Sequence, residues 1–365
     1  MINLRFFPSR GLAWYMAKLF LLRTLAVVGA LVVILQTLDL LSESSKVLAH
    51  ASNGDAELWR YVSLRLPQIV AFVFPFGALL GTLITLATLN QNSEVVSMKA
   101  AGLSAHQILA PLVLASLALA AVSYGFNERI VTRASETLAD WQDNDYGPVP
   151  RDTGMRPNVW VRYNEDLVLA RQVQAAGERT QLANLTIYDR TGETLQGIVN
   201  AERAVRQGRG WELLNVSRFE VSTGQTSRLP ALHWGDGLEP IQFTLAKVKA
   251  DQQTFPTLRH SIQQLKASGR PTADLESGLW HKLSKPLSVI LMPLLGGIAA
   301  FGLARSGQLL LRAVVGMALG FAFFVADNFS LAMGNFGAYP PLVAAWAPFL
   351  LFLLIGETVL IRTEE

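Results

Sequence analysis

The chain has 365 residues, of which 51% are hydrophobic and 16% are charged, with a formal net charge of +3. Because charged residues make up roughly a quarter of an ordinary soluble domain, this composition excludes an ordinary soluble enzyme. The small net charge provides no broad basic field for binding nucleic acid. Cysteine is absent, which excludes disulfides, thiol catalysis and thiolate metal sites.

Six long apolar runs organise the chain, three before and three after a polar middle at about residues 127–277. A helix needs roughly 20 consecutive apolar residues to cross a hydrocarbon core, and each run is about that long. The predicted spans are Trp14–Leu41, Tyr61–Leu89, Leu103–Phe126, Leu279–Ala304, Leu309–Met333 and Pro341–Ile361. The predicted fold class is therefore an α-helical membrane protein with six transmembrane helices and one inserted domain between spans three and four.

The polar middle carries the alternation of apolar and polar residues that is typical of β-strands. It is visible at residues 159–162, 167–173, 182–188 and 211–221, with a turn at Gly208-Arg209-Gly210. Short strands separated by turns favour an antiparallel sandwich, jellyroll or barrel. The predicted domains are a first transmembrane half at 1–126, an all-β, jellyroll-like domain with helical connectors at 127–277 and a second transmembrane half at 278–365.

The two connectors of this middle domain have helical periodicity. Residues 128–142 are predicted to extend the third span as an amphipathic helix. Its apolar side chains are Ile130, Ala134, Leu138 and Trp141. Residues 257–267 place Leu258, Ile262 and Leu265 on one face and lead back to the fourth span.

The basic residues of the short loops indicate the orientation in the membrane. One side collects Arg5, Arg10, Lys18, Lys99, Arg305, Arg312 and Arg362, whereas the other has only Lys46 and Arg60. Both termini are therefore predicted to be cytoplasmic. With three spans before it, the middle domain is predicted to lie in the periplasm of a bacterium with an inner membrane.

No catalytic motif is visible in the sequence. The five histidines are scattered, without an HExxH pair that would hold a metal. No GxxxxGK[ST] occurs, so the chain cannot hydrolyse ATP through a P-loop of its own. The GxSxG elbow of hydrolases is also missing. The chain is therefore predicted not to be an enzyme.

The loop between spans two and three contains a short predicted helix at about residues 91–102. Ser93 is a candidate N-cap, Glu94 gives an acidic first turn, and Gly102 ends the helix. Val95 and Met98, together with Val96, supply an apolar side. Such a helix has the form of a docking element for a partner protein. The alternative is an interfacial helix that only joins two spans.

Four segments resemble the LptF/LptG permeases, the membrane subunits of the lipopolysaccharide transport ABC system. They are SEVVSMKAAG at 93–102, LWHKLSKPLS at 279–288, GFAFFVADN at 320–328 and GAYPP at 337–341. The resemblance extends over nearly the whole chain, and two segments are more similar to the LptG branch. The lysine cluster that this branch has at the end of the first span is missing, since Lys46 is the only lysine nearby.

This resemblance implies a half-permease that pairs with an LptF-like paralogue and docks on a dimer of an LptB-like ATPase. That ATPase would bind ATP and magnesium, so no cofactor is expected in this chain. LptC-like and LptA-like bridge proteins would receive lipopolysaccharide from the periplasmic jellyroll. The 93–102 segment would be the coupling helix, with Glu94 facing a basic residue of the ATPase.

A lipid with phosphates requires cations near the periplasmic ends of the spans. The candidates are Lys46, Arg60, Arg65, Lys282 and Lys285, and the last two are neighbours on one helix face. The alternative is that these side chains only reach toward the membrane interface.

Other polar and small residues inside the spans are candidates for internal contacts. Asp39, Asp327 and Glu357 are ionisable residues within apolar runs, and Asp327 is the best candidate for an internal polar contact. Two GxxxG patterns, Gly77 with Gly81 and Gly316 with Gly320, allow helices to approach closely. They serve either packing within the chain or a seam or gate between subunits.

The sequence thus predicts a permease subunit that extracts lipopolysaccharide from the inner membrane, driven by ATP hydrolysis in a separate subunit. One alternative is a stand-alone secondary lipid transporter, which would need ion-binding carboxylates at the membrane midplane. The other is a membrane anchor for a periplasmic scaffold domain.

Overall fold

The structure is a computed structural model that describes residues 8–147, 155–174, 180–191, 194–244, 249–267, 270–301 and 309–362. Arg5 and Arg305, used above for the orientation, lie outside the described residues, as does the predicted end of the fourth span. The chain forms two compact units. The helical unit comprises Met1–Pro148, Ala250–Leu258 and Ala273–Glu365, and the β unit comprises Val149–Lys249 and Arg259–Thr272.

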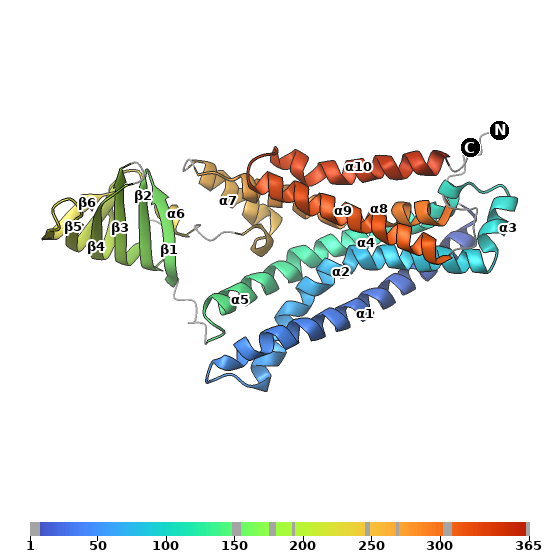
Figure 1. Cartoon of the computed structure of the whole chain (residues 1–365), viewed down its shortest axis with the longest axis horizontal. Helices are drawn as coiled ribbons and strands as arrows, with labels where there is room; N and C mark the ends of the chain where they lie inside the picture. Colours follow the sequence, from blue (N-terminus) through green and yellow to red (C-terminus); the bar gives the residue numbers. More distant parts are fainter. Residues whose placement is uncertain are drawn as a thin grey trace. The chain divides into compact units, whose positions relative to one another are not determined.

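The helical unit contains the six apolar helices that the sequence predicts, and they lie alongside one another (Figure 1). They are α1 (Arg10–Ala49), α2 (Asp55–Gln91), α4 (Ala105–Phe126), α8 (Ala273–Phe301), α9 (Leu309–Asn335) and α10 (Pro341–Arg362). At 1.5 Å per residue the 40 residues of α1 span about 60 Å, twice the thickness of a hydrocarbon core. Helix α1 therefore continues well beyond its predicted apolar run.

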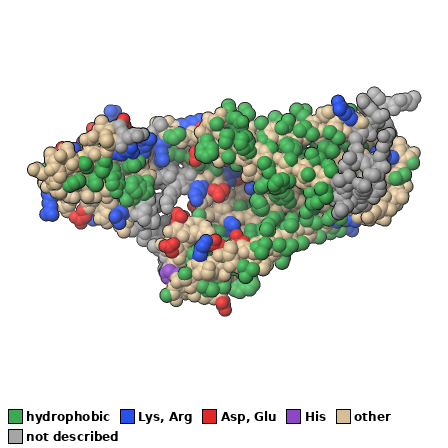
Figure 2. All heavy atoms as spheres, viewed as in Figure 1, with side chains coloured by type: hydrophobic (Ala, Val, Ile, Leu, Met, Phe, Trp, Pro, Cys, Tyr) green, Lys and Arg blue, Asp and Glu red, His purple; other side chains and the backbone are tan. Residues whose placement is uncertain are grey.

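The core of the helical unit centres on α8. In its most apolar window 78% of the residues are buried, against 22% in the corresponding windows of α1 and α9. Leu295 of α8 is fully buried, together with Leu86 of α2 and Leu112 of α4. The outer helices leave hydrophobic side chains exposed across the visible face of the helical unit (Figure 2). This surface suits a hydrocarbon environment rather than water.

Contacts between helix termini define one end of the helical unit, called the α3 end here. The short helix α3 (Glu94–Ala100) lies there. Tyr15 of α1 reaches Glu94, and the Lys99 ammonium lies over the Phe301 ring at the close of α8. His106 at the start of α4 contacts Glu357 near the end of α10. The opposite end, where α4 leads into the β unit and α8 begins, is called the insertion end.

At the insertion end, α4 continues through a π turn, Asn127–Val131, into α5 (Thr132–Asp143). The backbone N–H of Thr132 donates to the carbonyl of Asn127, five residues earlier. Leu138 and Trp141 are buried as predicted, whereas Ile130 is 48% exposed. The π turn breaks the regular helical phase between them, which explains the one misplaced residue.

The β unit is built on a six-stranded antiparallel sheet in which every strand pairs with its neighbours in sequence. The strands are β1 (Met155–Tyr163), β2 (Asp166–Gln174), β3 (Gln181–Thr191), β4 (Thr194–Gln207), β5 (Gly210–Glu220) and β6 (Thr226–Trp234). This confirms an all-β insertion between the third and fourth spans. Strands β4 and β6 were not predicted: β4 turns small residues such as Gly197 and Ala201 inward, and most of β6 is exposed.

One face of the sheet carries the core of the β unit. Val168 of β2, Leu185 of β3 and Leu213 of β5 are buried there. Trp211 is fully buried, packs edge-on against Phe243 of α6 (Pro240–Thr244) and donates its indole N–H to the carbonyl of Leu238 at 2.8 Å. The segments η3 (Ala250–Gln252) and α7 (Phe255–Ala267) follow, and α7 buries Leu258, Ile262 and Leu265 as predicted.

Candidate functional site

Helix α3 has a sharply defined start and end. Ser93 adopts a left-handed conformation at φ 59°, and its side chain makes no capping hydrogen bond. Gly102 follows the helix at φ 83°, where glycine is favoured. The N–H groups of Gly102 and Leu103 donate to the carbonyls of Lys99 and Met98, which forms a Schellman motif. The local sequence thus predicts the helix end correctly, but it does not predict the strained backbone at Ser93.

Contrary to the sequence prediction, the apolar residues of α3 do not all lie on one exposed docking surface. Val95 and Met98 are buried in the helical core, so their side chains help to fix α3 to the unit. Val96 is the apolar residue that faces outward, with 63% of its surface exposed. Glu94 is half-buried and accepts a hydrogen bond from the Tyr15 hydroxyl at 3.3 Å. The outward surface of α3 therefore includes half-buried Glu94 and exposed Val96, next to exposed Ser97, Lys99 and Ala100, and Val95 and Met98 support it from inside.

Arg65, one of the five predicted phosphate-binding cations, is held by Asp39 of α1. The guanidinium Nη2 lies 2.9 Å from Asp39 Oδ1, and Nε also donates to this carboxylate. Tyr61 donates its hydroxyl to the same carboxylate at 2.6 Å. Gln68 accepts a further bond from Arg65 Nη1. This network joins α1 to α2 near the insertion end and occupies most donors of Arg65.

Three further candidates are also engaged within the chain. Lys46 pairs with Glu43 at 2.7 Å, and the Arg60 guanidinium lies 4.7 Å from the centroid of the Trp141 ring. Lys282 lies 3.7 Å from Glu128, with both side chains mostly buried. Four of the five predicted cations thus have a partner within the chain.

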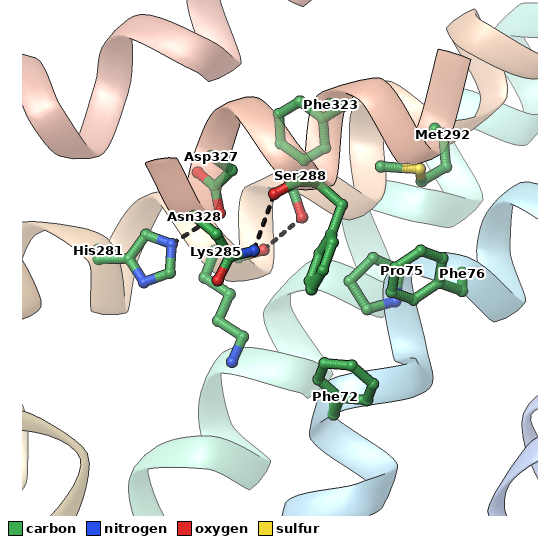
Figure 3. A pocket seen from close by; sticks show the side chains of 12 residues that line it. Phe72, Pro75, Phe76, His281, Lys285, Ser288, Met292, Phe323, Asp327 and Asn328 are labelled. Atoms are coloured by element: carbon green, nitrogen blue, oxygen red, sulfur yellow. Dashed lines mark hydrogen bonds and ion pairs between the residues drawn. The ribbon is translucent and has the colours of Figure 1, made fainter. Parts of the chain in front are cut away.

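Lys285 differs from these four cations. Its side chain is exposed, and among the described residues it forms no ion pair. It projects into a cavity of about 90 Å³ between α2, α8 and α9 (Figure 3). Phe72, Phe76, Phe323 and Phe324 form the aromatic part of this cavity. The arrangement joins a free ammonium to an apolar surface, which suits an anionic group attached to a hydrocarbon.

His281 and Asp327 form the polar part of the cavity wall. His281 Nε2 of α8 lies 2.9 Å from Asp327 Oδ2 of α9, and the two side chains are 15% and 16% exposed. Figure 3 shows them side by side at one edge of the cavity, next to Asn328. The predicted internal contact of Asp327 is therefore present. His281 was missed as its partner, although it stands one helical turn before Lys285 on the same helix.

The GxxxG glycines pack helices of this chain against each other. A Cβ on Gly77 would lie 2.2 Å from Val28, and one on Gly81 would lie 2.3 Å from Thr24, so both glycines serve the α1–α2 contact. On α9, Gly316 and Gly320 face Leu83 and Leu79 of α2. All four glycines thus lie at close contacts within the chain.

The sequence matches a known family over nearly its full length. Residues 14–362 match the family described as lipopolysaccharide export system permease LptF/LptG. The chain is 26% identical over 309 residues to the lipopolysaccharide export system permease protein LptG of Escherichia coli K12, covering 83% of this chain and 84% of that protein. It is 24% identical over 355 residues to the LptG protein of Haemophilus influenzae, covering 93% and 97%.

Proposed function

Because the chain belongs to the LptF/LptG family of lipopolysaccharide export system permeases, we propose that it is a half-permease that extracts lipopolysaccharide with energy from a separate ATPase. Its six apolar helices and its family make it a multi-pass protein of the inner membrane. The members of this family are permease subunits of a transport system and not themselves enzymes.

The outward surface of α3 is the observation that carries the ATPase part of the proposal. Its half-buried Glu94 and exposed Val96 stand on a helix fixed to the unit by buried Val95 and Met98. A rigidly attached helix transmits a push from a bound partner to the helices around it. We assign the partner as an LptB-like dimer that binds ATP and magnesium, because the sequence itself contains no P-loop.

The α3 end faces the cytoplasm in this proposal, and the β unit lies in the periplasm. Arg10, Lys99 and Arg362 support this orientation because they stand at or near the α3 end. The chain then pairs with an LptF-like paralogue, and LptC-like and LptA-like proteins accept lipopolysaccharide in the periplasm.

Lys285 is the residue we assign to a lipid phosphate. It has a free ammonium beside an aromatic surface, which matches a phosphate linked to acyl chains. Arg60, Arg65, Lys46 and Lys282 act in this proposal only when their present partners release them. Gly316 and Gly320, which lie against Leu83 and Leu79 of α2, are assigned to a gate contact that opens when α9 moves away from α2.

Copurification tests the coupling role of α3. The full chain, expressed with its partner subunits and purified in mild detergent, should retain the ATPase, and Glu94→Arg should release it. Arg362→Glu, a charge reversal of equal size on α10, serves as the control and should leave the ATPase bound. Full lipid transport without any ATPase would overturn the proposal and favour a stand-alone secondary lipid transporter.

Lipid binding tests the role of Lys285. Lys285→Gln should weaken binding of phosphorylated lipid A roughly tenfold or more, because a hydrogen bond to a charged group is worth about 1.5–3 kcal/mol. Dephosphorylated lipid A should be affected little. An equal loss for both lipids would show that Lys285 has only a structural role.

A further inference from the structure

Glu128 occupies an unusual position in the helical unit. It lies in the π turn at Asn127–Val131, which departs from the regular hydrogen bonding of α4 and α5. Such turns are rare and often occur at functional sites. Each carboxylate oxygen of Glu128 has its own partner: Oε1 accepts the backbone N–H of Phe255, the first residue of α7, and Oε2 faces the Lys282 ammonium. One side chain thus joins three segments that are distant in sequence.

The ion pair between Glu128 and Lys282 differs from the others at the insertion end. Its atoms are 3.7 Å apart, against 2.7 Å for Lys46 with Glu43 and 2.9 Å for Arg65 with Asp39. Its side chains are nevertheless more buried than those of these two pairs, at 17% and 14% exposed. A buried pair with a long separation has lost water without gaining the strongest Coulomb attraction. An incoming anion can therefore compete for Lys282 more easily than for Arg65.

The charges around Lys282 and Lys285 are unfavourable for a phosphate while Glu128 stays in place. Three described carboxylates, Glu128, Asp251 and Asp327, act electrostatically on these two lysines. Asp327 is already shared with His281. Glu128 is the carboxylate in direct contact with Lys282. Neutralising it leaves two carboxylates for the two lysines, in place of three.

We propose that Glu128 is a positioning residue that withholds Lys282 from the lipid phosphate held by Lys285. While Glu128 pairs with Lys282, one lysine of α8 meets the phosphate, and when the pair opens, both lysines do. The bond from Phe255 to Glu128 makes this choice depend on where the start of α7 lies. The proposal rests on the proposed lipopolysaccharide substrate and adds a control on how strongly its phosphate is held.

Glu128→Gln separates the charge of this residue from its structural role. The amide oxygen of Gln can still accept the N–H of Phe255, but the ion pair with Lys282 is lost. The full chain with its partner subunits should then bind phosphorylated lipid A roughly tenfold more tightly, since each freed lysine adds one charged hydrogen bond. Binding of dephosphorylated lipid A should not change.

Two further variants make the experiment decisive. Glu57→Gln neutralises a carboxylate that likewise accepts a backbone N–H, from Gly54, and that, among the described residues, holds none of the five candidate cations, so it should leave the binding of both lipids unchanged. In a Lys282→Met background, Glu128→Gln should have no effect on lipid binding. A tenfold gain that persists without Lys282 would show that Glu128 only repels the phosphate, and that result would overturn the positioning role.

The outcomes distinguish this inference from the function on which it depends. If the unaltered chain binds phosphorylated and dephosphorylated lipid A equally, the proposed phosphate contact fails, whatever the variants do. If it prefers the phosphorylated lipid but Glu128→Gln leaves that preference unchanged, only the role of Glu128 fails.

Discussion

In the β unit, the apolar residues of the strand pattern are the ones that are buried. In the helical unit, the most hydrophobic segments are not the most buried ones. Along β2, Val168, Ala170 and Val173 are buried while their neighbours are exposed or half-buried. The most apolar window of α1 is more hydrophobic than that of α8, yet only 22% of it is buried, against 78% for α8.

The difference follows from the solvent of each unit. The outer face of the sheet meets water, so its polar residues mark the outside directly. The outer helices meet hydrocarbon, so both their inner and outer faces are apolar. Which face packs against a neighbouring helix is then set by small residues and by polar contacts between helices. The following predictions test whether the two units respond to substitution as this contrast requires.

Removal of a large buried side chain should cost most in the β unit. We expect Trp211→Ala to lower the free energy of unfolding by about 3–5 kcal/mol, since it leaves a cavity beside Phe243 and deletes the bond to Leu238. Trp160→Ala, at a tryptophan that is 50% exposed and stacked on Tyr188, should cost about 1 kcal/mol. Limited proteolysis of the full chain in detergent at rising temperature measures both.

In the helical unit, adding a methyl group at a helix contact should cost more than adding one at an exposed position. Gly81→Ala would place a Cβ 2.3 Å from Thr24 Oγ1 and 2.8 Å from Thr24 Cα, so α1 and α2 must separate. We expect a loss of about 1–3 kcal/mol. Gly29→Ala, with nothing within 4 Å, should instead stabilise α1 slightly, because alanine favours helices. Equal thermal stability of the two variants in detergent would contradict the close contact.

The polar tie between α8 and α9 should contribute less. Asp327→Asn keeps a hydrogen-bond acceptor for His281 but removes its charge, and we expect a loss of about 1 kcal/mol. The pair of His106 and Glu357 has the same chemistry with side chains that are 30% and 41% exposed, so Glu357→Gln should have a smaller effect. Thermal unfolding of both variants in one detergent compares the pairs.

The smallest expected effect is a pH dependence in the β unit. Burial raises the pKa of Asp166, and the nearby Asp189 and Glu165 raise it further, against the bond from the N–H of Arg190. Above this raised pKa, the charged carboxylate of Asp166 therefore lowers the free energy of unfolding. This destabilisation disappears as the pH falls and Asp166 becomes protonated. Asp166→Asn should raise the free energy of local opening at Arg190, measured by hydrogen exchange, by less than about 0.5 kcal/mol at pH 7. Near pH 3 the substitution should leave this free energy unchanged. A difference that grows on acidification would contradict this sign.

Local patterns in the sequence were sufficient for several features of the site. Gly102 was identified as the end of α3 because a left-handed residue is favoured there. Asp327 was identified as a residue with an internal contact because an isolated carboxylate in an apolar helix needs a partner. The inward direction of Val95 and Met98 was missed, since seven residues of helix give too little periodicity to show which apolar side faces the core.

The sequence alone determined that six apolar helices and an inserted antiparallel β unit make up this chain, because run length and alternation are local properties. Only the tertiary structure decided which cations are already paired and that Lys285 faces a cavity. Those outcomes depend on how each helix is rotated and on residues far apart in the chain, such as Glu128 and Lys282. A membrane helix is almost equally hydrophobic on all sides, so its hydrophobic pattern does not determine how it is rotated about its own axis. Packing at glycines and polar contacts between helices determine that rotation.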